Sequence, residues 1–403
     1  MNSTAEARTP LAATGSPLRV PTDFSSELRL LLTLLRCALH TGDPAEVGEL
    51  CRGMDWTRFA ACFKRHRVGA FLHHRLPPRA REALPEPTRS ELGRAAGRAM
   101  RRSLTRATEL ARIVRVLEDG GIGVASLKGP LLSLELYGDL GHRHSGDLDL
   151  IVGPSEVLRT DAILRACGYV RVEPDFELTP RQQEAHLRFH RENKYLGPAN
   201  GIRLEVKWRL FGSAGDWRGE RKRKEVAGRG VETLSIEENA LYLFVHGARH
   251  GWFRVFWLVD VALLLLDRRI DWPTVRSDAR KLGAERSLLQ GAALACELLG
   301  VPLPGALVPL PGEQRVLGWL VAHAKRQVSR RVRPGSEPPE PVGYAILLES
   351  GWRARREILQ GRFMYARNWR ILPLPDSLFG LHYAAAPALW LYRRIAGRSG
   401  HHG

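Results

Sequence analysis

The stretch HRHSGDLDLIV, residues 142–152, decides how the middle of this chain folds. Asp147 and Asp149 stand one residue apart, and the residues after them are apolar. Side chains alternate faces along a β-strand, so a strand here places both carboxylates on one face and the apolar residues on the other. Neighbouring carboxylates repel each other and raise each other's pKa. The pattern therefore predicts a buried strand whose polar face binds a cation.

The segment before this strand, GVASLKGPLL, has the sequence of a phosphate-binding turn. A short apolar run ends at Gly129, and Pro130 suits the first turn of a helix. Glycine permits close approach of a ligand to the backbone, and a helix N-terminus offers free N–H groups to anions. Lys128 adds a positive charge, and Arg143 and Ser145 lie just before the aspartates. We therefore expect a phosphate cradle made by these side chains.

A third carboxylate lies downstream, in the alternating run IRLEVKWRL. The turn residues before this run predict a β-hairpin, and alternation places Glu205 on a polar face with Arg203 and Lys207. Mg²⁺ prefers carboxylate oxygens and commonly shares its shell with substrate phosphates. From a neighbouring strand, Glu205 is placed to complete a Mg²⁺ site with Asp147 and Asp149. The alternative is a solvated strand face on which Glu205 pairs with the basic residues beside it.

The chain divides by composition into four segments and predicts an α+β fold, with a small mixed sheet between helical regions. The segments are a disordered tail at 1–22, an N-terminal helical region at 23–118, an α/β core at 119–234 and a C-terminal helical region at 235–403. Within the core, the charged and glycine-rich run at 212–230 is expected to be a loop. The apolar run VFWLVDVALLLL is too short to span a bilayer, which needs about 20 residues, and predicts a buried helix.

The overall composition is that of a soluble globular protein, with 403 residues, 44% hydrophobic and 26% charged. The formal net charge of +18 favours an anionic partner such as a nucleotide or RNA, although arginines spread along the chain are also typical of a GC-rich genome. Five cysteines without a C-x-x-C pair argue against a disulfide framework and a cysteine zinc site. This cysteine usage, with no signal-peptide pattern at the start, predicts a cytoplasmic protein and no membrane partner.

The block LKGPLLSLELYGDLGHRHSGDLDLIV resembles an uncharacterised bacterial nucleotidyltransferase family, whose members carry L-K-G-x-x-L…Y…R-x-x-x-D-x-D-L-L-V. The family belongs to the DNA polymerase β-like nucleotidyltransferase superfamily. More distantly, the block is similar to abortive-infection and toxin nucleotidyltransferases. LEVKWRL is similar to the family's acidic-x-His-Trp segment, and LYLFVHGARHGWFRVFWLVDVALLL to its helical histidine-rich segment. The resemblance covers roughly residues 25–270.

The resemblance implies a polymerase β-like core at 119–234 that moves a nucleoside monophosphate from ATP or another triphosphate to an acceptor and releases pyrophosphate. Two Mg²⁺ ions would bind the triphosphate and lower the pKa of an acceptor hydroxyl, which attacks the α-phosphate. The implied catalytic and metal-binding residues are Asp147, Asp149 and Glu205, and the implied nucleotide-binding residues are Lys128, Gly129, Arg143 and Ser145.

Two positions depart from the family pattern. Pro130 stands where the superfamily often has Gly or Ser, so one phosphate-binding N–H is missing. Lys207 stands where the family commonly has His. All three carboxylates are present, so we expect an active enzyme.

The acceptor is not readable from the sequence, and three hypotheses stay open. A small molecule or peptide is favoured; RNA or tRNA, as in the toxin relatives, is the alternative, and a non-catalytic nucleotide-binding module is the third. His246 and His250 share a helix face but lack the H-E-x-x-H glutamate, so we expect a helix packed beside the cleft. The basic run from Arg218 to Lys224 is more typical of a solvated loop than of an RNA-binding site.

Overall fold

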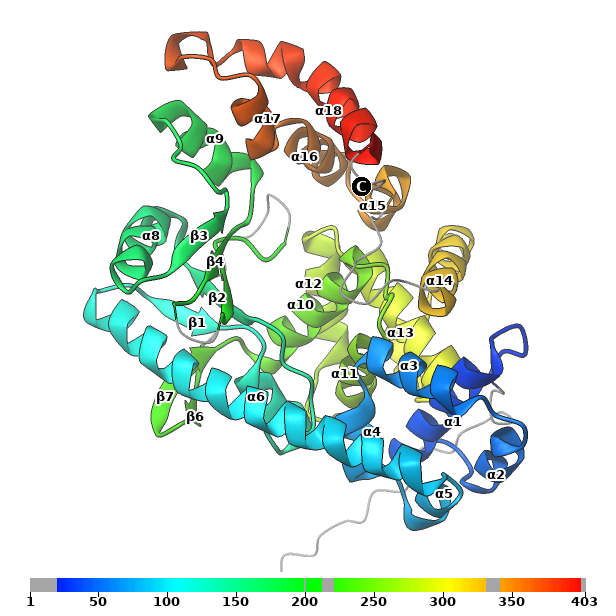
Figure 1. Cartoon of the computed structure of the whole chain (residues 1–403). Helices are drawn as coiled ribbons and strands as arrows, with labels where there is room; N and C mark the ends of the chain where they lie inside the picture. Colours follow the sequence, from blue (N-terminus) through cyan, green and yellow to red (C-terminus); the bar gives the residue numbers. More distant parts are fainter. Residues whose placement is uncertain (1–19, 199–200, 212–220, 331–340, 400–403) are drawn as a thin grey trace, which may run out of the picture.

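The computed structural model describes residues 20–198, 201–211, 221–330 and 341–399. These residues form an α+β fold in which helices surround one seven-stranded sheet (Figure 1). The fold class predicted from the sequence is confirmed, with helical regions before and after the strands. Most of the expected tail lies outside the described residues, and the four segment boundaries stay a prediction.

The sheet has the strand order β3-β4-β5-β2-β1-β7-β6. Its strands are β1 (Val124–Ser126), β2 (Leu148–Val152), β3 (Val170–Glu173), β4 (Glu192–Leu196), β5 (Arg203–Lys207), β6 (Lys222–Val226) and β7 (Arg229–Thr233). β2 runs antiparallel to β1 and parallel to β5, while β4 pairs antiparallel with β5 and β1 pairs parallel with β7.

The helices fall into three groups along the chain. Before the sheet are α1 (Ser26–Ala38), α2 (Ala45–Cys51), α3 (Trp56–His66), α4 (Gly69–Arg75), α5 (Pro78–Glu82) and α6 (Glu86–Asp119). Between strands are α7 (Pro130–Tyr137), η1 (Pro154–Glu156), α8 (Val157–Ala166) and α9 (Pro180–Phe189). After the sheet are α10 (Ile236–Arg249), α11 (Val255–Leu266), α12 (Trp272–Lys281), α13 (Glu285–Leu299), η2 (Gly305–Leu307), α14 (Gln314–Ser329), α15 (Val342–Leu348), α16 (Trp352–Phe363), α17 (Ala366–Ile371), η3 (Asp376–Leu378) and α18 (Leu381–Ser399).

The centre of the sheet is β2, whose five residues are all buried. Asp149 on β2 lies opposite Glu205 on β5 in the parallel ladder. Neighbouring strands are about 4.8 Å apart, and residues in register point to the same face. The hairpin predicted before and through LEVK is confirmed as β4 and β5, and it brings together two carboxylates that are distant in the sequence.

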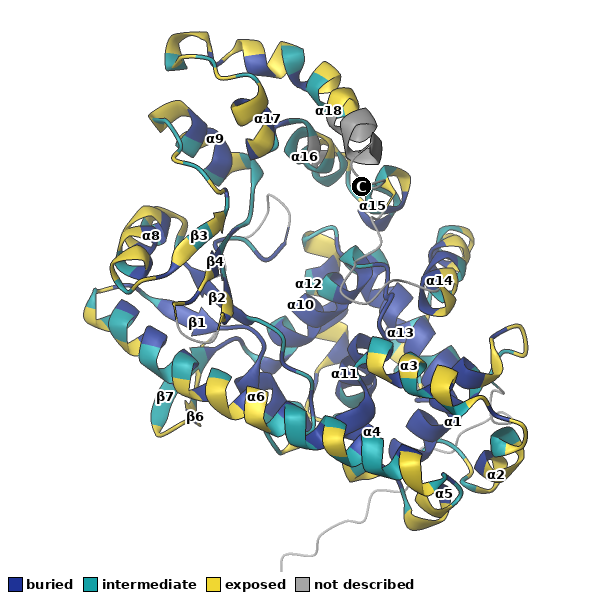
Figure 2. Cartoon of the chain, viewed as in Figure 1, coloured by how far each residue is buried: buried dark blue, intermediate teal, exposed yellow. Residues whose placement is uncertain are grey.

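Two hydrophobic clusters hold helices against the two faces of the sheet. One joins the N-terminal helices to α10, α11 and α13 and reaches the sheet at Ala125 and Ile151. The other contains Leu148 and Leu150 together with Leu110 and Leu117 of α6. Figure 2 shows α10, α11 and α13 largely buried, whereas the outer side of α6 is exposed. Because Asp149 alternates with Leu148 and Leu150, its carboxylate faces the α10–α11 side.

The apolar run that the sequence identifies as a buried helix forms α11, and ten of its residues are buried. Among the residues that the structure describes, no helix is long and apolar enough to cross a membrane.

The sequence predicts a loop over 212–230, and this prediction is wrong for its second half. Lys222–Val226 and Arg229–Thr233 form the β6–β7 hairpin, and β6 is an edge strand of the sheet. Edge strands commonly carry charged side chains, which discourage pairing with other chains. Because Lys and Arg residues replace the usual apolar residues here, the sequence lacks the alternation that predicts a strand. Residues 212–220 of the run, with the first part of the basic segment, lie outside the described residues.

Candidate active site

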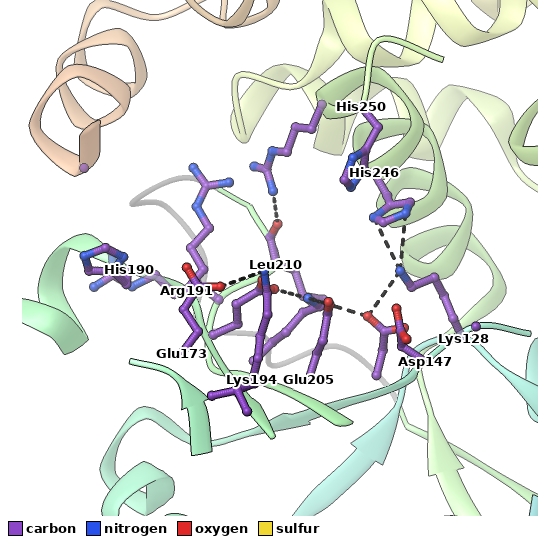
Figure 3. Close-up of a pocket in the computed structure, with 18 of the residues that line it drawn as sticks. Lys128, Asp147, Glu173, His190, Arg191, Lys194, Glu205, Leu210, His246 and His250 are labelled. Carbon is purple, nitrogen blue, oxygen red and sulfur yellow. Dashed lines mark hydrogen bonds and ion pairs between the residues drawn. The ribbon is translucent and has the colours of Figure 1, made fainter. Parts of the chain in front are cut away.

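A cavity of about 540 Å³ opens over the polar face of the sheet centre. Its walls come from the β1–α7 turn, from β2, β4 and β5, from α10 and α11, and from α16 and α17. In Figure 3, Lys128, Asp147, Glu205 and His246 point into the same space from separate elements. Of the residues that the sequence predicts to bind nucleotide or metal, all but Ser145 line this cavity.

The β1–α7 turn requires glycine at position 129. Gly129 has φ +74° and ψ −139°, a conformation that residues with a Cβ rarely adopt. A Cβ there would lie 3.7 Å from both Leu148 Cδ2 and Ser145 Oγ, so the backbone angle rather than lack of space excludes other residues. The Oγ of Ser145 is buried and has no hydrogen-bond partner among the described residues. Leaving such a group unpaired costs about 1–3 kcal/mol.

Four carboxylates gather where β2, β5 and β4 meet, and we call them the acidic cluster. Its members are Asp147, Asp149, Glu192 and Glu205. Asp147 lies one residue before β2, and among the described residues no side chain pairs with its carboxylate. Burial and then repulsion from Glu205 raise the pKa of Asp147. The ionised form of Asp147 therefore destabilises the folded protein, and a bound cation would remove this destabilisation.

Lys128 reaches the acidic cluster from the end of β1. Its Nζ lies 3.2 Å from Asp149 Oδ1 and 3.4 Å from both ring nitrogens of His246 on α10 (Figure 3). Burial is the largest influence and lowers the pKa of Lys128, but Asp149, Tyr242 and Glu205 together outweigh it and the net shift is upward. Burial beside Lys128 holds the pKa of His246 well below its usual range, so a neutral imidazole faces the ammonium group. His246 therefore lies beside the Lys128 amine without adding a second positive charge.

Lys207 is the second ammonium group in the acidic cluster. Its Nζ donates to Glu205 Oε2 at 2.7 Å, contacts Glu192, and lies 3.5 Å from Asp149 Oδ1. Burial opposes the charge, but Glu192 and the other neighbouring anionic groups raise the pKa of Lys207 well above its ordinary value. Lys207 thus shares the polar face with Glu205, as strand alternation predicts, yet it is buried rather than solvated.

Arg143 lies beside the cavity and is held by a carboxylate of α11. Its Nε and Nη2 donate to Asp260 Oδ1 and Oδ2, each at 2.8 Å, and its Nη1 donates to the His144 carbonyl oxygen at 3.3 Å. Tyr137 Oη also donates to Asp260 Oδ1, at 2.6 Å. All three nitrogens of the Arg143 guanidinium therefore have protein partners, and the pair ties the segment before β2 to the helical region.

The end of the cavity away from Gly129 is cationic. Arg191 precedes β4, and Arg249, the last residue of α10, donates to the Leu210 carbonyl oxygen at 3.0 Å. Burial and then repulsion from Arg191 lower the pKa of Arg249 to about 9. Glu349 is one of the nearby opposite charges, and burial raises the pKa of that carboxyl group. These arginines suit an anionic group of a substrate.

C-terminal residues close the same end of the cavity. Tyr365 Oη donates to Glu173 Oε1 at 2.6 Å, and Arg370 Nη1 donates to Asp175 Oδ2 at 2.7 Å. A small hydrophobic cluster joins Ala185 of α9 to α17 and α18. These contacts hold α16 and α17 over β3 and α9, as the arrangement of these elements in Figure 1 shows.

The carboxylates have the chemistry that Mg²⁺ requires, but ammonium groups occupy part of the space between them. Within the described residues, no group of three or more His, Cys, Asp or Glu side chains is arranged as a metal site. Asp147 is the open position, because its carboxylate has no partner in the part of the chain that the structure describes and its pKa is raised. The residues therefore fit a cation at Asp147 and Asp149, whereas Lys207 occupies the Glu205 side.

Comparison with known proteins identifies the family. Residues 52–300, more than half of the chain, match the family model described as an uncharacterised nucleotidyltransferase. The chain belongs to this family. The family match contains the acidic cluster and α10 to α13, but it ends before α14 to α18. No curated protein and no solved structure gives a significant match. Membership in the family supports nucleotidyl transfer as the general activity and the transferase class.

Several residues at the site were not identified from the sequence alone. The run LEVK predicts that Lys207 shares a strand face with Glu205, but it does not predict the contact of Lys207 with Glu192 of β4. Arg249 and Tyr365 reach the cavity only through the packing of the helical regions. A lysine at the end of a buried strand, two residues after an acidic residue and so on the same face, is the signal that pointed to this arrangement.

Proposed function

We propose that this chain transfers a nucleoside monophosphate from a nucleoside triphosphate to a hydroxyl or phosphate group of an acceptor and releases pyrophosphate. The observation that carries the proposal is the register of β2 and β5, which sets Asp149 opposite Glu205 within one cavity that also contains the Gly129 turn. Family membership supports the reaction class.

The donor triphosphate, for which ATP is the first candidate, binds at the β1–α7 turn. Lys128 supplies a positive charge there, and Gly129 permits close approach. A hydrogen bond from the Ser145 hydroxyl, which does not line the cavity, stays a prediction. Arg143 keeps this segment in place through Asp260 and acts as a positioning residue. Direct phosphate binding by Arg143, as the family resemblance implies, stays a prediction.

Asp147 and Asp149 would hold Mg²⁺, which when bound neutralises charge on the triphosphate and polarises the phosphorus–oxygen bonds. The acceptor oxygen forms a bond to the α-phosphorus while the bond from that phosphorus to the bridging oxygen breaks. The electron pair of that bond leaves with pyrophosphate, and the hydroxyl proton passes to the Glu205 carboxylate. Lys128 stabilises the negative charge that develops on the phosphate oxygens.

The acceptor binds at the cationic end of the cavity. A cavity of about 540 Å³ lies within the range of small-molecule sites, roughly 300–1,000 Å³. Its walls from α16 and α17 favour a small molecule or a peptide end over a duplex nucleic acid, and Arg191 and Arg249 favour an acceptor with an anionic group. The cysteines of the described residues are all unpaired, which supports the proposed cytoplasmic location.

Transfer from labelled nucleotide tests the proposal. The protein is incubated with [α-³²P]ATP or [γ-³²P]ATP, Mg²⁺, and separate pools of small metabolites, peptides and RNA. Label that enters an acceptor from the α-position but not from the γ-position, with release of pyrophosphate, supports nucleotidyl transfer. Label from the γ-position would show a kinase instead. Labelling of RNA that falls steeply with salt would favour the RNA alternative. Nucleotide binding without transfer to any pool would favour a non-catalytic module.

A further inference from the structure

We infer that Lys207 supplies the positive charge that a second metal ion supplies in two-ion nucleotidyltransferases, so that this site takes one divalent ion with its nucleotide. The inference rests on the proposed function and specifies how the acidic cluster performs it. It replaces the expectation of two ions with a site of one ion and one built-in ammonium group.

The position of the Lys207 ammonium group is the first argument. Its Nζ lies 2.7 Å from Glu205 Oε2 and 3.5 Å from Asp149 Oδ1, between the two carboxylates that β2 and β5 bring into register. It also contacts Glu192 of the next strand. A lysine ammonium has three hydrogens to donate, so one group faces three carboxylates. A cation bridging Asp149 and Glu205 would occupy the same space.

The second argument is that the backbone holds Lys207 in this place. It ends β5, and its Cα pairs with Ile151 on one side and with Glu192 on the other. Its side chain is only 9% exposed. Buried carboxylates left without their cation are strongly destabilising, so moving the ammonium group out of the cluster carries a large cost. Lys207 is therefore a fixed part of the site.

The third argument is that the other side of the acidic cluster is open. Asp147 has no hydrogen-bond or ion-pair partner among the described residues, although it lines the cavity next to Gly129. Lys128 reaches Asp149 Oδ1 but makes no ion pair with Asp147. The cluster thus has one position for an incoming cation, at Asp147 beside the phosphate cradle, and one position already filled by Lys207.

The count of bound Mn²⁺ ions tests the inference directly. Mn²⁺ replaces Mg²⁺ as a paramagnetic probe, and electron paramagnetic resonance counts the ions bound per chain with saturating non-hydrolysable α,β-methylene-ATP. We expect one Mn²⁺ in the wild type and two in Lys207→Met, which keeps an unbranched side chain one atom shorter and removes the charge.

Lys194→Met is the matched control. Lys194 pairs with Glu173 and Glu192 from β4, at 3.1 and 3.4 Å, and forms no ion pair with Asp149 or Glu205. We expect this variant to bind one ion, as the wild type does. A change in its ion count would show that any lost charge near the cluster suffices, and would overturn the specific role of Lys207.

Two Mn²⁺ ions in the wild type, or a folded Lys207→Met variant that still binds one, would contradict the inference. Should Lys207→Met fail to fold, the wild-type count decides, because two ions there overturn the inference and one supports it. These outcomes differ from failure of the proposed function, in which the wild type binds no nucleotide at all. Wild type with two ions and bound nucleotide would leave the proposed function in place.

Discussion

Two buried charge clusters border the same cavity, and they differ in how their charges balance. In the first, Asp260 accepts two hydrogen bonds from Arg143 and one from Tyr137, and the two charged side chains are 1% and 5% exposed. In the second, the acidic cluster surrounds the ammonium groups of Lys128 and Lys207. Carboxylates outnumber these ammonium groups, and Asp147 has no partner among the residues that the structure describes.

The difference separates a structural pair from a binding site. A buried pair whose groups are all hydrogen-bonded needs nothing more, and removing one partner costs stability. A buried group with an uncompensated charge costs stability until a ligand arrives, and such groups gather at functional sites. The Arg143–Asp260 pair therefore holds the segment before β2 in place, and the acidic cluster is the proposed site for the metal and the nucleotide.

The largest expected effect comes from breaking the balanced pair. Asp260→Asn leaves the Arg143 guanidinium buried without its counter-charge, so the free energy of unfolding should fall by about 3–5 kcal/mol. Urea denaturation measures the change. Asp278→Asn is the control, because its ion pair with Lys281 lies on the surface and should contribute less than about 1 kcal/mol. Equal effects of the two substitutions would contradict a structural role for Asp260.

In the acidic cluster, the largest effect should fall on activity. Asp149→Asn removes a proposed metal ligand and the partner of Lys128, and we expect transfer from [α-³²P]ATP to drop by about 10²–10³-fold, as for other groups that stabilise charge in a transition state. Thermal unfolding followed by circular dichroism should still show a folded protein. Transfer within a few-fold of the wild type would rule out Asp149 as a catalytic residue, and Asp278→Asn again serves as the control.

A smaller effect is expected where the C-terminal helices close the cavity. Tyr365→Phe removes a hydrogen bond to the Glu173 carboxylate, of a type worth about 1.5–3 kcal/mol. Amide hydrogen exchange in α16 and α17 should become faster, while binding of nucleotide at the other end of the cavity stays unchanged. Tyr383→Phe is the control, since Tyr383 is 50% exposed. Unchanged exchange in Tyr365→Phe would mean that this contact does not hold the wall.

The smallest effect is expected for a substitution of Asp147, which should increase the stability of the folded protein rather than lower it. Burial raises the pKa of this carboxyl group above its ordinary value of 3.8, so the folded state disfavours its ionised form at neutral pH. Asp147→Asn should therefore unfold at a higher temperature than the wild type near pH 7 without metal. The difference should shrink as the pH falls through the raised pKa and vanish below about 3.8, where both folded and unfolded wild type are protonated. A variant less stable than the wild type at pH 7 would show that Asp147 is compensated.

The sequence predicted the parts of the site that depend on local patterns. Alternation around Asp149 predicted the strand and its polar face, and the Lys128–Gly129 run predicted the turn. Alternation around Glu205 predicted the strand that pairs with β2 in the structure. Each of these features follows from the period of a strand or from the backbone freedom of glycine. The fold class and the family followed from the same residues.

The sequence did not predict the features that depend on packing between distant segments. The partner of Arg143 is on α11, and the partner of Lys128 besides Asp149 is His246 on α10. The β6–β7 hairpin was not predicted, because a charged edge strand has a composition like that of a loop. Likewise, nothing in the sequence around α17 indicates that Tyr365, just before this helix, reaches Glu173 of β3.

Binding of the four ribonucleoside triphosphates, measured by isothermal titration calorimetry with and without Mg²⁺, tests the central claim most directly because it needs no acceptor. The wild type is compared with the Asp147→Asn, Asp149→Asn double variant. The account predicts that the wild type binds at least one triphosphate only when Mg²⁺ is present, and that the double variant does not bind it. Absence of binding by the wild type, or equal binding by the double variant, would contradict the assignment of the acidic cluster as a nucleotide–metal site.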